Sequence, residues 1–99
     1  MDFAGKNVFV TGAGGYIGSF TAKEFAARGA KVAVFDRNAE GVEKTVGEIN
    51  AAGGTAIGVT GDVTSSASVD EAVKSAAERM GGLDIMVHAA GGSARDENR

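Results

Sequence analysis

The segment TGAGGYIG (residues 11–18) has the glycine spacing that most directly suggests a chemical role. Such a turn between a strand and a helix places backbone N–H groups at the positive end of a helix dipole, where a pyrophosphate binds. Gly12 permits a sharp turn, and Gly14 or Gly15 lets phosphates approach the backbone. Gly18 lets the helix lie close to the sheet. Glycines alone are a weak signal, because a tight turn without a ligand can have the same letters.

The carboxylate of Asp36 strengthens this interpretation. It ends a second apolar run, KVAVFD (residues 31–36), near the distance of about 20 residues at which an acidic group meets the adenosine ribose. A carboxylate accepts hydrogen bonds from both ribose hydroxyls and repels a 2′-phosphate. The sequence therefore predicts NAD in preference to NADP. Two alternatives stay open: Asp36 as a solvated strand-end carboxylate, and Arg37 as an acceptor of a 2′-phosphate.

Alternating strand and helix patterns are expected to position these residues. The first helix is predicted to have Ile17, Thr21 and Phe25 on one face, with Gly18 and Ala22 beside them. The third helix is predicted to begin with a capping box of Ser68 and Glu71. Apolar runs predict strands over residues 6–12, 31–36 and 55–62 and a fourth strand that runs into a glycine turn over residues 83–92. Helical spacing predicts helices over residues 17–28, 39–52 and 69–80.

This alternation predicts an α/β fold with a parallel sheet buried on both faces. Right-handed crossovers make a doubly wound, Rossmann-type arrangement the simplest topology. We expect a partial version of it, with four strands in the order 3-2-1-4 and three crossover helices.

The composition limits the class of protein. Of the 99 residues, 43% are hydrophobic and 23% are charged, which is typical of soluble globular chains. The net charge of -3 argues against nucleic acid or a membrane surface as a partner. No apolar run has the length of a membrane span, so a cytoplasmic protein is expected. Cysteine is absent and His88 is the single histidine, which excludes disulfides and a zinc cluster.

Four stretches of the chain resemble the N-terminal half of the short-chain dehydrogenase/reductase family: TGAGGYIG, the pair Phe35 and Asp36, GDVTSSASVDEAV from Gly61, and LDIMVHAAG ending at Gly91. The resemblance implies a pyrophosphate at residues 11–18, the ribose at Asp36, and the adenine at Asp62 and Val63. For Asp62, a cap or turn role stays open. The implied cofactor-binding residues are Gly12, Gly14, Gly15, Tyr16, Ile17, Gly18, Asp36, Arg37, Asp62, Val63, Ala90 and Gly91.

Two short segments depart from the compact branch of the family. Tyr16 replaces a glycine of its TGxxxGIG motif, and His88 begins His-Ala-Ala-Gly where that branch has Asn-Asn-Ala-Gly. Both variants are similar to the extended branch, which contains nucleotide-sugar epimerases and dehydratases. The longer stretches resemble the compact branch, and we give them more weight. Tyr16 is expected to cover the pyrophosphate or to face solvent, and His88 to tune a strand-end hydrogen bond or to lie satisfied at the edge of the core.

The family's reaction is hydride transfer between a nicotinamide and an alcohol or carbonyl carbon, and the resemblance implies this activity for the parent enzyme. It uses a tyrosine, a lysine and a serine beyond the fourth strand. Here the single tyrosine is Tyr16 and no Tyr-x-x-x-Lys exists, so no catalytic residue is assigned. We expect residues 1–92 to form the dinucleotide-binding half and residues 93–99 to be a polar tail leading into a missing C-terminal half. A homo-oligomer acting on an alcohol or ketone is implied by resemblance, and a noncatalytic NAD-binding module is the alternative.

Overall fold

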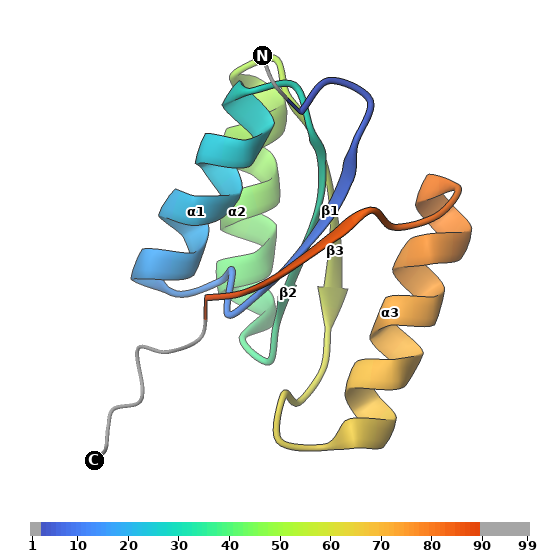
Figure 1. Cartoon of the computed structure of the whole chain (residues 1–99). Helices are drawn as coiled ribbons and strands as arrows, with labels where there is room; N and C mark the ends of the chain where they lie inside the picture. Colours follow the sequence, from blue (N-terminus) through green and yellow to red (C-terminus); the bar gives the residue numbers. More distant parts are fainter. Residues whose placement is uncertain (1–2, 90–99) are drawn as a thin grey trace.

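The predicted strands pair in parallel in the order β3-β2-β1-β4, in a computed structural model that describes residues 3–89. Figure 1 shows α1 and α2 side by side on one face of the sheet and α3 on the other. The predicted Rossmann-type topology with three crossover helices is therefore confirmed. In chain order the elements are β1 (Asn7–Thr11), α1 (Tyr16–Ala27), β2 (Lys31–Asp36), α2 (Ala39–Ala51), β3 (Thr55–Thr60), α3 (Ser66–Met80) and β4 (Ile85–His88).

The register of the sheet brings the carboxyl ends of neighbouring strands to one edge. Thr11, the last residue of β1, pairs with Phe35 of β2 and with His88 of β4. Phe35 in turn pairs with Val59 of β3. The segments that follow the strands therefore begin next to one another at this edge.

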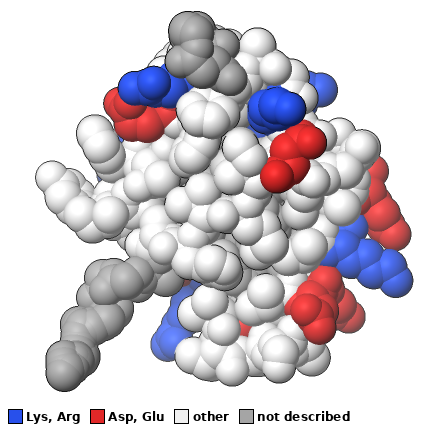
Figure 2. All heavy atoms as spheres, viewed as in Figure 1, with Lys and Arg blue, Asp and Glu red and all other residues white. Residues whose placement is uncertain are grey.

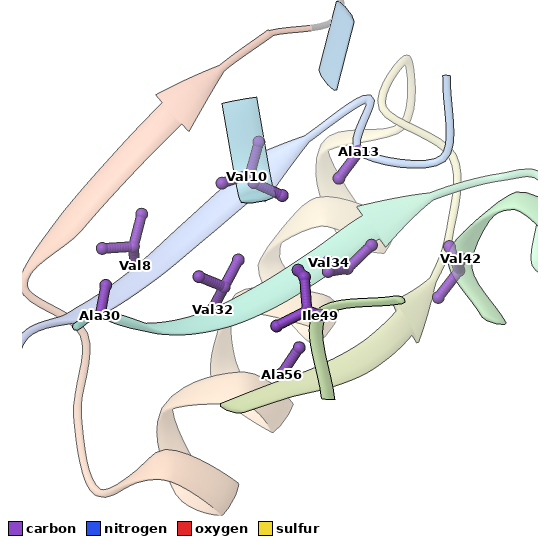
Figure 3. Close-up of a cluster of buried hydrophobic side chains, with 10 residues drawn as sticks. Val8, Val10, Ala13, Ala30, Val32, Val34, Val42, Ile49 and Ala56 are labelled. Carbon is purple, nitrogen blue, oxygen red and sulfur yellow. The ribbon is translucent and has the colours of Figure 1, made fainter. Parts of the chain in front are cut away.

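The central strands β1 and β2 are buried on both faces, because α1 and α2 cover one face of the sheet and α3 covers the other. On the α3 face, the rings of Phe9 and Phe35 pack with centroids 5.5 Å apart, against Ala72 and Ala76 of α3. Strands buried on two faces have nearly continuous apolar sequences, which is why β1 and β2 are recognisable from sequence. The cluster on the α1 and α2 face, shown in Figure 3, consists of Val8, Val10, Ala13, Ala22, Ala30, Val32, Val34, Val42, Ile49 and Ala56.

Helix α1 packs on the sheet through small residues. Gly18 and Ala22 are its buried residues, whereas Ile17 is 55% exposed. A side chain at Gly18 would collide with the carbonyl oxygen of Gly12, so this approach of two backbone segments requires glycine. The predicted face is therefore confirmed at Gly18, Ala22 and Phe25, which packs against the core cluster, but it is wrong at Ile17.

Helix α3 begins earlier than predicted. Its N-cap is Ser65, whose hydroxyl accepts a hydrogen bond from the Ser68 amide at 3.2 Å. The Ser68 hydroxyl instead accepts a hydrogen bond from the Asp62 amide at 2.9 Å. The predicted capping box of Ser68 and Glu71 is therefore wrong, because Ser68 lies inside the first turn and fastens the loop after β3.

Strand β4 pairs with β1 on one side and has no partner strand on the other side among the described residues. Ile85 and Val87 are half-buried against the core, and Met86 is 42% exposed. Figure 2 shows that the face over which β4 runs in Figure 1 is mostly uncharged in its centre. This edge therefore offers apolar side chains and unpaired backbone groups for further packing.

The two glycines Gly18 and Gly47 give a direct test of this packing. Both lie in helices, but a Cβ at Gly47 would meet nothing within 4 Å. We expect Gly47→Ala to raise the free energy of unfolding by about 0.5–1 kcal/mol, because alanine favours a helix. Gly18→Ala should lower it by about 1–3 kcal/mol through overpacking against Gly12. Urea unfolding measures both, and equal stabilisation by the two substitutions would contradict the close approach.

Candidate cofactor-binding site

A hollow of about 340 Å³ lies at the carboxyl edge of the sheet. It includes residues that follow β1 and β4, the two strands between which the strand order reverses. In open parallel sheets, ligands bind in the crevice at this reversal. The hollow is lined by Gly12, Gly15, Tyr16, Ile17, Gly18, Phe35, Asp36, Arg37, Val63 and Ala89.

The glycine loop, residues 12–15, forms one wall of the hollow and leads into α1. Gly12 has a φ of 70°, in the left-handed region that favours glycine. The amide of Gly15 donates to the carbonyl oxygen of Gly12 at 3.1 Å, which closes the turn. Gly18 then lies directly over Gly12. The loop thus turns the chain sharply from the end of β1 into the start of α1.

The N-terminus of α1 carries no capping side chain. Its N-cap is Gly15, whereas α2 and α3 are capped by Asn38 and Ser65. The N–H groups of a first helical turn need partners from outside the helix and carry the positive end of its dipole. The first-turn residues Tyr16 and Ile17 both line the hollow. This end of the hollow is therefore suited to an anionic group such as a phosphate.

The carboxylate of Asp36 is half-buried and lies between the glycine loop and the start of α2. Its Oδ2 accepts a hydrogen bond from the Gly14 amide at 3.0 Å. Its Oδ1 accepts one from the Asn38 amide, also at 3.0 Å. An ionised carboxylate offers about four lone-pair sites, so about two remain for a ligand in the hollow. Asp36 can therefore hold the loop and accept hydrogen bonds from hydroxyl groups at the same time.

Beyond Asp36, the wall of the hollow is formed by Arg37 and by Val63, which is 43% exposed. The neighbouring Asp62 turns its carboxylate toward Thr64, whose hydroxyl and amide donate to Oδ1 at 2.7 and 2.9 Å. These two bonds, first the hydroxyl and then the amide, lower the pKa of Asp62, and the charge of Arg37 adds to the effect. Asp62 thus occupies the turn role that the sequence left open.

The structure places most of the predicted residues around one hollow. Two predicted residues do not line the hollow: the Gly14 amide donates to Asp36, and Asp62 precedes the lining residue Val63 in the chain. Ala90 and Gly91 fall outside the described residues. Phe35 and Ala89 also line the hollow and were missed, since the pattern marks Phe35 as a core residue and its ring is indeed buried.

His88, at the end of β4, is exposed, and its Nδ1 lies 3.4 Å from the hydroxyl of Thr11. This contact agrees with the expected strand-end hydrogen bond. It joins the carboxyl ends of β1 and β4 next to the hollow. Tyr16 is 89% exposed at the first position of α1.

The bond between Thr64 and Asp62 predicts a pH effect. A carboxyl with a lowered pKa in the folded state stabilises the fold at pH values above its unfolded pKa, and the stabilisation is lost as the pH falls through the folded pKa. Thr64→Val removes the hydroxyl donor, so the pKa of Asp62 should rise toward its ordinary value. NMR titration of the Asp62 carboxyl measures this, with the exposed Thr60→Val as control. An unchanged pKa in Thr64→Val would contradict the assigned cause.

Comparison with known proteins agrees with this geometry. An uncharacterized oxidoreductase of Bacillus subtilis is 39% identical over 95 residues, which make up 96% of this chain and 34% of that protein. A hydroxysteroid dehydrogenase from Escherichia coli has a TM-score of 0.84 at 37% identity, covering 87% of this chain and 37% of that chain. A 3-ketoacyl-(acyl-carrier-protein) reductase from Brucella melitensis, solved in complex with NADH, has a TM-score of 0.77 at 42% identity, covering 85% of this chain and 33% of that one.

The chain thus spans about a third of the length of most of the curated relatives that it matches, and less of the others. The family model that describes the short chain dehydrogenases matches residues 6–99, nearly the whole sequence. These matches favour the dehydrogenases over the nucleotide-sugar epimerases of the extended branch. On its sequence, its fold and the site at the carboxyl edge of its sheet, the chain belongs to the short-chain dehydrogenase family.

Proposed function

We propose that this chain is the NAD(H)-binding part of a dehydrogenase that transfers hydride between the cofactor and an alcohol or carbonyl substrate. The family uses nicotinamide cofactors, so the class of cofactor follows from membership. The observation that carries the proposal is the position of Asp36. Its carboxylate lines the same hollow as the uncapped start of α1, so one ligand with a pyrophosphate and a ribose can contact both.

The residues of the hollow fit the parts of a dinucleotide. The first-turn N–H groups at Tyr16 and Ile17 would hold the pyrophosphate, and Asp36 would accept hydrogen bonds from the ribose hydroxyls. Asp62 and Val63 would border the adenine. When bound, the nicotinamide supplies the hydride chemistry. The proposed cofactor-binding set also includes Gly12, Gly14, Gly15, Gly18 and Arg37 and, beyond the described residues, Ala90 and Gly91.

The preference for NAD over NADP is part of the proposal and rests on charge. A 2′-phosphate on the adenosine ribose would lie beside the half-buried carboxylate of Asp36, and like charges repel strongly where water is partly excluded. Arg37 lines the same hollow and would reduce that repulsion. The related reductase from Brucella melitensis was solved with NADH, which supports the same preference.

The acid/base chemistry is proposed to come from outside this sequence. Tyr16 is the single tyrosine of the sequence. It is the first residue of α1, where we propose that the pyrophosphate binds, so it is not assigned the acid/base role. We propose residues 1–92 as the dinucleotide-binding half and residues 93–99 as the start of a connection to the catalytic half. The mostly uncharged β4 face in Figure 2 is suited to packing against such a half.

The whole protein is proposed to be a cytoplasmic homo-oligomer that acts on a small alcohol or ketone. Family resemblance supports the substrate class and the oligomer. None of the helices in residues 3–89 has the length and apolar character needed to cross a membrane. The noncatalytic module has no observation in its favour and is not proposed.

Substitution of Asp36 tests the cofactor proposal. We expect Asp36→Ala, in the whole protein, to weaken NAD binding by about 10–100-fold, the scale of a lost charge-assisted hydrogen bond. NADP binding should weaken less, because the repulsion of the 2′-phosphate is removed at the same time. Calorimetric titration with both cofactors measures the ratio. Asp70→Ala is the control, because it removes an exposed carboxylate of α3 that lies outside the hollow. Equal losses for NAD and NADP would contradict the role of Asp36.

A further inference from the structure

We propose that Thr45 of α2 is a positioning residue for cofactor binding. Its hydroxyl fixes Ala13 and thereby holds the glycine loop in place against Asp36. Thr45 does not line the hollow, so this role acts through the loop. The inference rests on the proposed function, since it concerns the affinity of the same site for NAD(H).

The hydroxyl of Thr45 is committed to the glycine loop. The residue is 2% exposed, and its Oγ1 donates to the carbonyl oxygen of Ala13 at 3.0 Å. A threonine inside a helix ordinarily finds an acceptor one turn back in its own helix. Thr21 of α1 does this, donating to the carbonyl oxygen of Ile17 at 3.0 Å. Thr45 instead reaches out of α2 to a segment that lies far from it in the sequence.

The backbone of Ala13 is thereby held on both sides. Its N–H donates to the carbonyl oxygen of Phe35 at 3.0 Å, and its carbonyl accepts from Thr45. The methyl group of Ala13 is fully buried in the core cluster, at the end of the sheet where β1 stops (Figure 3). Ala13 is therefore one of the residues through which the glycine loop is attached to the rest of the molecule.

A second contact from α2 supports the same segment. Gly41 lies one turn before Thr45, and a Cβ at Gly41 would approach the carbonyl oxygen of Gly14 to 2.5 Å. On the other side, a Cβ at Gly14 would meet the Cβ of Asp36 at 3.0 Å. The backbone of Gly14 is thus enclosed between α2 and the side chain of Asp36, to which its amide donates.

These contacts connect α2 to the glycine loop and to Asp36, which one dinucleotide would have to contact at the same time. The loop leads into the uncapped end of α1, and Asp36 accepts the hydrogen bond from Gly14. If the Thr45 hydroxyl is removed, the buried carbonyl of Ala13 loses its donor, and the segment relaxes to recover one. The two parts then no longer lie at the separation that a dinucleotide requires.

The test compares three substitutions in α2 of the whole protein by fluorescence titration with NADH. Thr45→Val keeps the shape and removes the hydroxyl, and the NADH dissociation constant should rise about fivefold, the scale of one hydrogen bond. Thr45→Ser keeps the hydroxyl and should bind like the wild type. Ile49→Val lowers the stability of the same helix, one turn further on and outside the hollow, and should leave the dissociation constant unchanged.

A second measurement compares the hydrogen exchange of the glycine loop in protein without cofactor. Amide hydrogen exchange of peptides spanning residues 12–18 should be faster in Thr45→Val than in Ile49→Val. The proposal is overturned if the two variants match in exchange of these peptides, or if both weaken NADH binding equally. A wild-type protein that binds no NADH would contradict the proposed function, and the exchange comparison would still decide whether Thr45 positions the loop.

Discussion

The glycine loop after β1 has almost no side chains with which to fix its own position, and the surrounding contacts follow from this constraint. A phosphate-binding backbone must be free of side chains on the ligand side and must also be rigid. The rigidity is supplied from outside the loop. The carbonyl of Phe35 and the hydroxyl of Thr45 hold Ala13, and the carboxylate of Asp36 holds Gly14.

The order of the strands makes these anchors available. Because β2 pairs with β1, the end of β2 lies beside the start of the loop, and α2 continues from β2 across the same region. One short stretch of sequence therefore provides both the anchors of the loop and the carboxylate proposed for the ribose. Asp36 can serve in both roles because its two present hydrogen bonds leave lone pairs free. The proposed selection of NAD and the hydrogen bonds that hold the loop therefore depend on the same carboxylate.

The strand order and most of the residues that line the hollow could be predicted from the sequence. Buried parallel strands and glycine-bounded helices have strong patterns, and an acidic residue at the end of the second strand has a recognisable spacing. The contacts that hold the glycine loop and the start of α3 could not be predicted from the sequence. Thr45 looks like any polar residue within a helix, and its partner Ala13 lies far away in the chain. Three serines, Ser65, Ser66 and Ser68, lie at the start of α3, and the sequence pattern alone does not choose the cap among them. In the structure Ser65 is the cap, and the Ser68 hydroxyl accepts a hydrogen bond from the Asp62 amide instead.

We propose that one dinucleotide contacts both the start of α1 and the carboxylate of Asp36. A crystal structure of the whole protein with NADH tests it most directly. We expect the pyrophosphate to lie within hydrogen-bond distance of the amides at Tyr16 and Ile17, and the adenosine ribose hydroxyls to bind Asp36, with the bond from Gly14 to Asp36 retained. NADH bound elsewhere, or with its ribose turned away from Asp36, would show that the two parts of the hollow do not form one dinucleotide site.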